Sequence, residues 1–180
     1  VGNVDDLGAD VVLIATGRAA NTDGLALEKA GISYDRKGIT VDDNMLTNVA
    51  GVYAVGDVNG RSMLAHAAEW QGRRAVNHII GEHDDIRFDI MPSAIFTYPE
   101  AACVGPAESE LKEKGVEYAV HKSFYRANGK ALAIGETEGM MKIITDTSDR
   151  VISCHGYGAH AADLIQEVSA LMNKEITLRQ

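Results

Sequence analysis

Short apolar runs and helical spacing alternate along the first part of the chain. The runs at 11–15 (VVLIA) and 52–55 (VYAV) contain only apolar residues, which is typical of strands covered on both faces of a parallel sheet. From Met63 to Ile80 apolar residues recur at helical spacing, and Gly81 is expected to end that helix. Strands that alternate with helices predict an α/β unit here.

The pattern changes after a polar stretch, and we place a domain boundary within 82–91. Beyond it we expect strands at 93–97, 116–120, 140–145 and 151–154, and helices at 108–114 and 161–172. The polar segment 146–150 joins the last two strands and predicts an antiparallel hairpin. Helices beside antiparallel strands indicate an α+β module.

Length and composition are those of an ordinary globular protein, with 180 residues, 46% hydrophobic and 24% charged. Acidic residues outnumber basic ones by 26 to 17, which gives a net charge of −9. This balance argues against a nucleic-acid partner, which would require a basic surface. No apolar run approaches the ~20 residues of a membrane span, so no membrane association is expected.

The cysteines and histidines form no recognisable metal or redox motif. Cys103 and Cys154 lie far apart, without metal-ligand or CxxC spacing, and we interpret both as small buried residues. His78 and His83 are five residues apart, which is poor spacing for ligands on one helical face. No metal site is predicted, and a reducing, cytoplasmic compartment is the expectation.

The ends of the chain suggest further sequence beyond them. The chain begins at Val1 instead of a methionine. Residues 176–180 read as the start of a helix without a stop signal. We therefore expect this chain to be a piece of a longer protein.

Asp57 is the strongest candidate for ligand binding, because it follows the apolar run and Gly56 in GVYAVGDV (51–58). In open α/β sheets ligands bind beyond the carboxyl ends of the strands, where a carboxylate accepts hydrogen bonds from ligand hydroxyls. Gly56 would allow close approach, and the helix that begins near Met63 would aim amides and a partial positive charge at the ligand. A plain Asx turn explains the same pattern, and spacing alone does not separate the two interpretations.

Two glycine motifs give weaker signals. Gly17 in ATGR follows the run at 11–15 and suits a ligand-approach position or, more simply, a turn. The segment GYGAHA at 156–161 matches the G-x-G-x-x-A dinucleotide fingerprint. That fingerprint also needs a parallel strand after the helix, which the sequence does not provide. We interpret this match as coincidental.

Taken in order, five segments resemble the pyridine nucleotide-disulfide oxidoreductase family of flavoproteins. They are ADVVLIATGRAANT, GVYAVGDV, MLAHAAEWQGRRA, PSAIFTYPEAACVG and GAHAADLIQEVSALMNKEITLRQ. The resemblance extends from about Gly8 to Gln180 and is far more specific than any single motif. MLAH and FTYPE are similar to the branch that oxidises dihydrolipoamide, and differ from the glutathione-reductase branch.

The resemblance implies two cofactors, FAD and NAD. The residues implied to bind them are Gly17, Asp57, Met63, Leu64, Ala65 and His66. Asp57 would bind the ribityl chain of FAD. The helix start at 63–66 would lie against the pyrimidine edge of the flavin, where negative charge collects on reduction. Gly17 would lie in the NAD site.

The resemblance also divides the chain. Residues 1–82 would be the C-terminal part of the NAD/FAD-binding region, an α/β remnant of the FAD-binding domain. Residues 91–180 would be an α+β interface domain with an antiparallel sheet, through which family members form homodimers. The redox disulfide, the glycine fingerprints and the catalytic His-Glu pair of the family are absent from this sequence. No catalytic residue is therefore assigned, and the chain looks cut just before the catalytic histidine.

The activity implied for the whole protein is oxidation of dihydrolipoamide through a disulfide and FAD, with NAD⁺ as the final acceptor. Its protein partner would be the lipoyl-bearing component of a 2-oxo acid dehydrogenase complex. Within the family, a mercuric reductase and a soluble transhydrogenase are the alternatives. The isolated chain is expected to be inactive, and a non-catalytic dimerisation module is the alternative interpretation of it.

Overall fold

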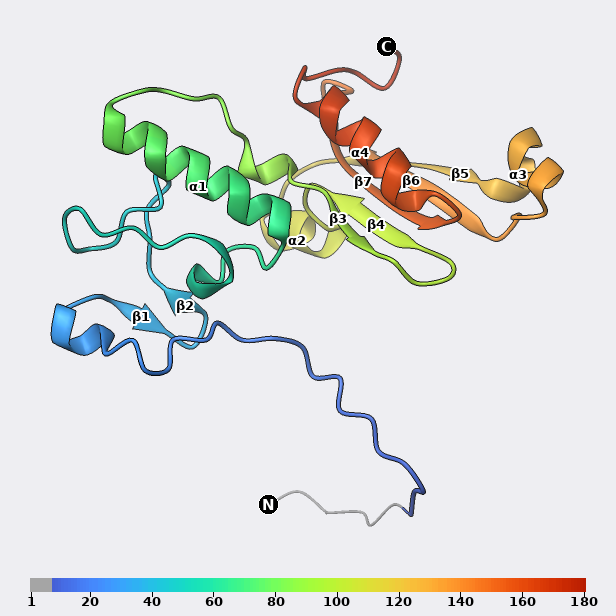
Figure 1. Ribbon diagram of the computed structural model, residues 1–180. Helices are drawn as coiled ribbons and strands as arrows, with labels where there is room; N and C mark the ends of the chain where they lie inside the picture. The colour runs from blue at the N-terminus through green and yellow to red at the C-terminus, as the bar shows by residue number, and fades with distance from the viewer. Residues whose placement is uncertain (1–7) are drawn as a thin grey trace. The chain divides into compact units, whose positions relative to one another are not determined.

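The computed structural model describes residues 8–180 and divides between Gly81 and Glu82 into two compact units (Figure 1). Residues 1–7, with which the predicted domain 1–82 begins, lie outside the described part of the chain. Each unit has an apolar core of its own. Every helix within residues 8–180 is too short or too polar for a membrane span.

The first unit consists of short elements around a small core. They are η1 (Leu27–Ala30), β1 (Tyr34–Asp35), β2 (Gly38–Ile39), η2 (Gly56–Asn59) and α1 (Ala65–Ile80). β1 and β2 pair antiparallel. The core contains Leu27, Ile39 and Ala54. η2 packs directly on α1, and this contact positions the turn that carries Asp57.

The strands predicted at 11–15 and 52–55 do not form in the described chain, so both predictions are wrong. Residues 11–15 are extended and exposed, with Leu13 87% exposed. Within 52–55 only Tyr53 joins an isolated bridge, with Leu46. A buried parallel strand requires hydrogen-bonded neighbours and covered faces. Within residues 8–180 no strand lies beside 11–15, and residues 52–54 share backbone bonds with the irregular segment 45–47 instead of with a strand.

α1 confirms the helix predicted from apolar spacing. It spans Ala65–Ile80 and ends at Gly81, whose φ of 76° is left-handed. Its buried residues are Ala67, Gln71 and Ala75. They lie one helical turn apart, so one narrow stripe of the helix faces the first unit. That stripe contains one polar side chain between two alanines.

The second unit is a five-stranded antiparallel sheet with helices, as predicted for an α+β module. Its strands are β3 (Ser93–Ile95), β4 (Ala101–Val104), β5 (Ala119–Phe124), β6 (Gly139–Thr145) and β7 (Val151–Gly158). Its helices are η3 (Phe88–Ile90), α2 (Glu108–Glu113), η4 (Tyr125–Ala127), α3 (Gly129–Ile134) and α4 (Ala161–Met172). The strand order is β3-β4-β7-β6-β5, and every neighbouring pair is antiparallel.

The β6–β7 hairpin confirms the turn predicted at 146–150. Asp146 closes this turn, because its carboxylate accepts hydrogen bonds from the backbone N–H groups of Ser148 at 2.8 Å and Arg150 at 3.0 Å. An acidic side chain that bonds the backbone two residues ahead is a common turn signal. The sequence therefore contained the information that places this hairpin.

β5 starts later than the strand predicted at 116–120. Ala119 pairs with Thr145, and Phe124 pairs with Met140. The limits of β5 follow from its pairing with β6, because backbone groups need partners to form a ladder. The prediction from the local apolar run was therefore wrong at its N-terminal end.

β4 and α3 were not predicted from the sequence. The signal for α3 is nevertheless present: the Asn128 side chain accepts hydrogen bonds from the N–H groups of Lys130 and Ala131, and Gly135 ends the helix. This is a standard N-cap followed by a glycine C-cap. β4 consists largely of small residues, whose weak strand preference hid it.

α4 confirms the predicted amphipathic helix and covers β7, β4 and β3 (Figure 1). Ile165 points into the centre of this packing and is 1% exposed. The core around it contains Ile90, Ala102, Val104, Val151, Cys154, Ala161 and Met172. Burial of this apolar stripe against the sheet accounts for the stability of the second unit.

Tyr125 lies against two glycines at the paired ends of β6 and β7. A Cβ atom added at Gly139 would lie 2.5 Å from the backbone oxygen of Tyr157, and one added at Gly158 would lie 2.7 Å from the Tyr125 ring. The Tyr125 hydroxyl donates a hydrogen bond to Ala159 O at 2.9 Å. The tyrosine thus ties the hairpin end to the residues just before α4.

The helix start predicted at 176–180 is wrong. Thr177 instead forms a β-bridge with Arg150, and the N–H of Val151 donates to Ile176 O at 3.0 Å. The backbone of 176–177 bonds the hairpin, and a turn follows it that is closed by a bond from Gln180 N–H to Thr177 O at 3.1 Å. Residues 156–158 of GYGAHA belong to β7, which is antiparallel to both neighbours. This confirms that the motif is not a dinucleotide fingerprint, which needs a parallel βαβ unit.

Candidate functional site

Asp57 lies exposed in the one-turn helix η2, between buried neighbours. Gly56 and Asn59 are the buried residues of this turn. The turn is closed by a backbone bond from Gly60 N–H to Asp57 O at 3.1 Å. Within residues 8–180 the Asp57 carboxylate has no hydrogen-bond or ion-pair partner, so it does not form the alternative Asx turn. The carboxylate is therefore available to a ligand.

Gln71 of α1 attaches this turn to the helix. Its Oε1 accepts a hydrogen bond from Gly56 N–H at 2.7 Å and another from Asn59 Nδ2 at 2.8 Å. Asn59 Nδ2 also donates to Ala54 O at 3.0 Å. These buried bonds fix both sides of the residue that carries the candidate carboxylate.

Close packing between η2 and α1 requires glycine at position 56. Gly56 has a φ of 78°, and a Cβ added there would lie 3.3 Å from the Cβ of Ala68. Only glycine adopts this left-handed conformation without strain. The close approach seen at Gly56 is to Ala68 of α1, and the predicted approach of a ligand to this glycine stays a prediction.

Arg61 holds the segment that follows the turn. Its guanidinium donates to Asp42 O at 3.0 Å and to Asp43 Oδ1 at 2.7 Å. The hydrogen bond from Arg61 keeps the pKa of the Asp43 carboxyl below its ordinary value. The charge of Arg61 is therefore directed to the surface loop that contains Asp42 and Asp43.

The start of α1 brings the other predicted residues close to η2 along the chain. Met63 and Leu64 are half-buried, whereas Ala65 and His66 are exposed. Leu64 is the N-cap residue, and its side chain forms no capping hydrogen bond. An apolar cap leaves the first-turn amides and the positive end of the helix dipole directed outward.

Gly17 is not brought to this site by any contact of the described chain. It lies in the exposed extended segment before η1, with a φ of 90°, and no heavy atom lies within 4 Å of an added Cβ. The structure packs η2, which carries Asp57, on α1, the helix that begins just after Leu64. Gly17 lies in a separate exposed segment before η1.

Sequence reasoning missed Asn59 and Gln71, which hold the turn. A signal for Gln71 exists, because it lies between Ala67 and Ala75 at four-residue spacing on the face that the apolar pattern predicts to be buried. A polar side chain on a buried stripe needs a partner. That requirement alone could have identified Gln71 as a residue with a specific contact.

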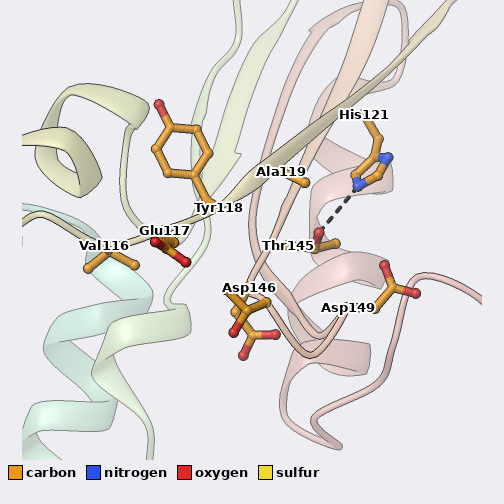
Figure 2. Close-up of a pocket in the computed structure, with 9 residues that line it drawn as sticks. Val116, Glu117, Tyr118, Ala119, His121, Thr145, Asp146 and Asp149 are labelled. Atoms are coloured by element: carbon orange, nitrogen blue, oxygen red, sulfur yellow. Dashed lines mark hydrogen bonds between the residues drawn. The ribbon is translucent and has the colours of Figure 1, made fainter.

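The second unit contains an open pocket beside the β6–β7 hairpin turn (Figure 2). Its lining residues are Val116, Glu117, Tyr118, Ala119, His121, Thr145, Asp146, Thr147 and Asp149. His121 Nε2 lies 3.2 Å from Thr145 Oγ1, and the carboxylate of Asp146 accepts from Arg150 Nε at 2.8 Å. These groups stabilise strand and turn, so we assign no catalytic role to them. No group of three or more metal-ligating side chains occurs within residues 8–180.

The two cysteines of the second unit are free thiols. Cys154 is fully buried in the core under α4, and Cys103 is half-buried. Burial raises the pKa of the Cys154 thiol to about 11 and also raises the pKa of Cys103. The buried position predicted for both cysteines is thus confirmed for Cys154, whereas Cys103 is only half-buried.

We expect Cys154 in the native protein to react with iodoacetamide at pH 8 at least about a hundredfold more slowly than in the unfolded chain. The thiolate is the reactive species, and the raised pKa together with burial removes it from reach. Mass spectrometry of tryptic peptides after timed labelling measures the rate, with the urea-unfolded protein as control. Equal labelling rates in the two states would contradict the buried, protonated thiol.

Comparisons with known proteins identify the family of this chain. The family described as pyridine nucleotide-disulphide oxidoreductase matches residues 1–72, and its dimerisation domain matches residues 91–180. A dihydrolipoyl dehydrogenase of Chlamydia muridarum is 40% identical over 179 residues, covering 98% of this chain and 38% of that relative. The mitochondrial dihydrolipoyl dehydrogenase 2 of Arabidopsis thaliana is 44% identical over 174 residues, covering 96% of this chain and 34% of the relative.

Solved structures give the same result. LpdA from Mycobacterium tuberculosis superposes with a TM-score of 0.79 at 32% identity, covering 89% of this chain and 36% of that protein. The HOCl-induced flavoprotein disulfide reductase RclA from Escherichia coli gives a TM-score of 0.79 at 26% identity, covering 93% and 40%. These matches confirm the predicted fold class. The chain spans less than half of the length of each relative. Because the family and its dimerisation domain match two consecutive parts that together make up most of the sequence, the chain belongs to the pyridine nucleotide-disulphide oxidoreductase family.

Proposed function

We propose that the chain is part of a flavin- and NAD-dependent enzyme that oxidises dihydrolipoamide, and that its first unit contributes to the FAD site. Relatives named dihydrolipoyl dehydrogenase that are 40% and 44% identical over nearly the whole chain support this substrate. FAD would take electrons from the substrate through a disulfide and pass a hydride to NAD⁺.

The observation that carries the proposal is the exposed Asp57 carboxylate on a turn fixed to α1. Its partnerless oxygens suit the hydroxyls of the ribityl chain, because a carboxylate is a strong acceptor. The helix start at 63–66, with its amides directed outward, suits an electron-rich ring edge. Both features occur on one short segment, so the residues present fit the flavin. We further propose that Gly17 contributes to the NAD site.

The second unit supports a proposal about assembly. Residues 91–180 match a dimerisation domain, and we propose that the protein forms a homodimer through them. The proposed protein partner is the lipoyl-bearing component of a 2-oxo acid dehydrogenase complex. The free thiols of Cys103 and Cys154 support a reducing compartment, for which we propose the cytoplasm.

The full-length protein that contains this chain is expected to reduce NAD⁺ with dihydrolipoamide as electron donor. The assay follows NADH absorbance. The acceptor substrates of related enzymes are tested for comparison, and these are glutathione disulfide, mercuric ion and a second pyridine nucleotide. The 180-residue chain serves as the control and should be inactive, because it contains no redox disulfide motif. If the protein preferentially turns over mercuric ion, or pyridine nucleotides without any other substrate, that substrate takes the place of dihydrolipoamide in this proposal.

A further inference from the structure

We infer that Gln71 is a positioning residue for the flavin: its buried amide oxygen holds the η2 turn in the conformation that presents Asp57. This inference rests on the proposed FAD site and adds to it a residue that does not touch the cofactor. The first step is geometric. A single oxygen, Gln71 Oε1, accepts hydrogen bonds from Gly56 N–H at 2.7 Å and Asn59 Nδ2 at 2.8 Å.

These two donors lie on either side of Asp57 in the turn. Gly56 directly precedes it, and Asn59 follows two residues later and also bonds Ala54 O at 3.0 Å. Local bonds to the turn come from Gly60 N–H to Asp57 O at 3.1 Å and from Arg61 N–H to Asn59 Oδ1 at 3.0 Å. The backbone on both sides of Asp57 is therefore bonded to an atom of another element, α1.

Burial makes this dependence strong. Gln71 is 2% exposed and Asn59 6% exposed, and Gly56 is buried as well. Water cannot readily replace the lost acceptor, so removal of Oε1 would leave the Gly56 N–H without this partner and the Asn59 amide with its bond to Ala54 O but without the bond to α1. The turn would relax to satisfy them, and the position of Asp57 would change with it.

The neighbours of Gln71 show that packing alone does not require a polar residue here. Ala67 and Ala75 occupy the same buried stripe one turn before and after it, and both are apolar. An apolar side chain would continue this stripe without the desolvation cost of an amide. The amide is explained by its two bonds to the turn.

The test compares three variants of the full-length protein in its flavin-free form. Gln71→Leu removes the acceptor, whereas Gln71→Glu retains an oxygen that can accept both bonds. Glu69→Leu is the matched control, because it makes a similar polar-to-apolar change on the exposed face of the same helix. FAD is added and its dissociation constant is measured by fluorescence, while hydrogen exchange reports the protection of the Gly56 amide.

We expect Gln71→Leu to raise the dissociation constant for FAD by at least about tenfold, and to speed exchange at Gly56 by a similar factor. Gln71→Glu should restore both values to within about threefold of the original, and Glu69→Leu should change neither. The inference is overturned if Gln71→Leu lowers the melting temperature but leaves the FAD affinity unchanged. It is also overturned if Gln71→Glu does not restore binding.

Failure of the proposed function gives a different result. In that case the unaltered protein binds no FAD, while hydrogen exchange at Gly56 still responds to Gln71→Leu. If the unaltered protein binds FAD and Asp57→Ala weakens it, but Gln71→Leu does not, the FAD site stands and the positioning role is wrong.

Discussion

Asp57→Ala is expected to weaken FAD binding to the full-length protein by about ten- to a hundredfold. A hydrogen bond to a charged acceptor contributes about 1.5–3 kcal/mol, and each 1.4 kcal/mol corresponds to about tenfold in affinity. Asp57 is exposed, and its carboxylate has no partner within residues 8–180. The substitution therefore removes the proposed ligand contact without breaking a contact of the fold. Fluorescence titration of the flavin-free protein with FAD measures the change.

Asp57→Asn and Asp23→Ala separate charge and position from general effects. The amide oxygen of Asp57→Asn still accepts hydrogen bonds but carries no charge, so its loss of affinity should be about half as large on the free-energy scale. Asp23 is another exposed aspartate of the first unit, and its removal should leave affinity unchanged. If Asp57→Ala binds FAD as tightly as the unaltered protein, the assigned ribityl contact is wrong.

Ile165→Ala is expected to destabilise the second unit by about 2–5 kcal/mol, the range for truncating a large aliphatic residue in a core. Ile165 is 1% exposed and packs in the core formed by α4 and the sheet. Ile165→Val should cost only about 0.5–1.5 kcal/mol, because most of the side chain remains. The midpoint of urea unfolding, followed by circular dichroism, measures both changes.

Glu167→Ala is the matched control for this series. Glu167 lies on the exposed side of α4, two residues after Ile165, and surface substitutions of this kind usually change stability by less than about 0.5 kcal/mol. An equal effect of Ile165→Ala and Glu167→Ala would mean that α4 does not pack on the sheet as described.

Elements with strong local signals could be predicted from the sequence. The apolar spacing of α1 and α4 and the polar turn at 146–150 all correspond to elements of the structure. Each depends on contacts that repeat along one face, or on residues adjacent in sequence. These features need no knowledge of distant segments.

Elements that depend on distant partners could not be predicted in the same way. The run at 11–15 has the composition of a buried strand, yet it is extended and exposed because the described chain provides no strand beside it. The limits of β5 depend on β6, and Thr177 bonds the hairpin although its local sequence suggested a helix. Pairing decides these segments, and pairing is not visible in a local pattern.

The candidate site likewise contains a feature with a local signal and a feature that depends on distant residues. The position of Asp57 after an apolar run and before a helix is local, and the sequence identified it. The bonds of Gln71 to Gly56 and Asn59 join residues 15 and 12 positions apart, respectively. Such bonds follow only when the turn is folded back on the helix, so the sequence pattern could at most have marked Gln71 as a buried polar residue.

The packing of Tyr125 against Gly139 and Gly158 has a consequence for heritable variation. Any missense change in either glycine codon adds at least a Cβ atom, which would meet the backbone oxygen of Tyr157 or the Tyr125 ring within 2.7 Å. Both positions also have positive φ values that other residues rarely adopt. At these two codons, selection for a folded second unit should therefore leave synonymous differences as the main variation among alleles.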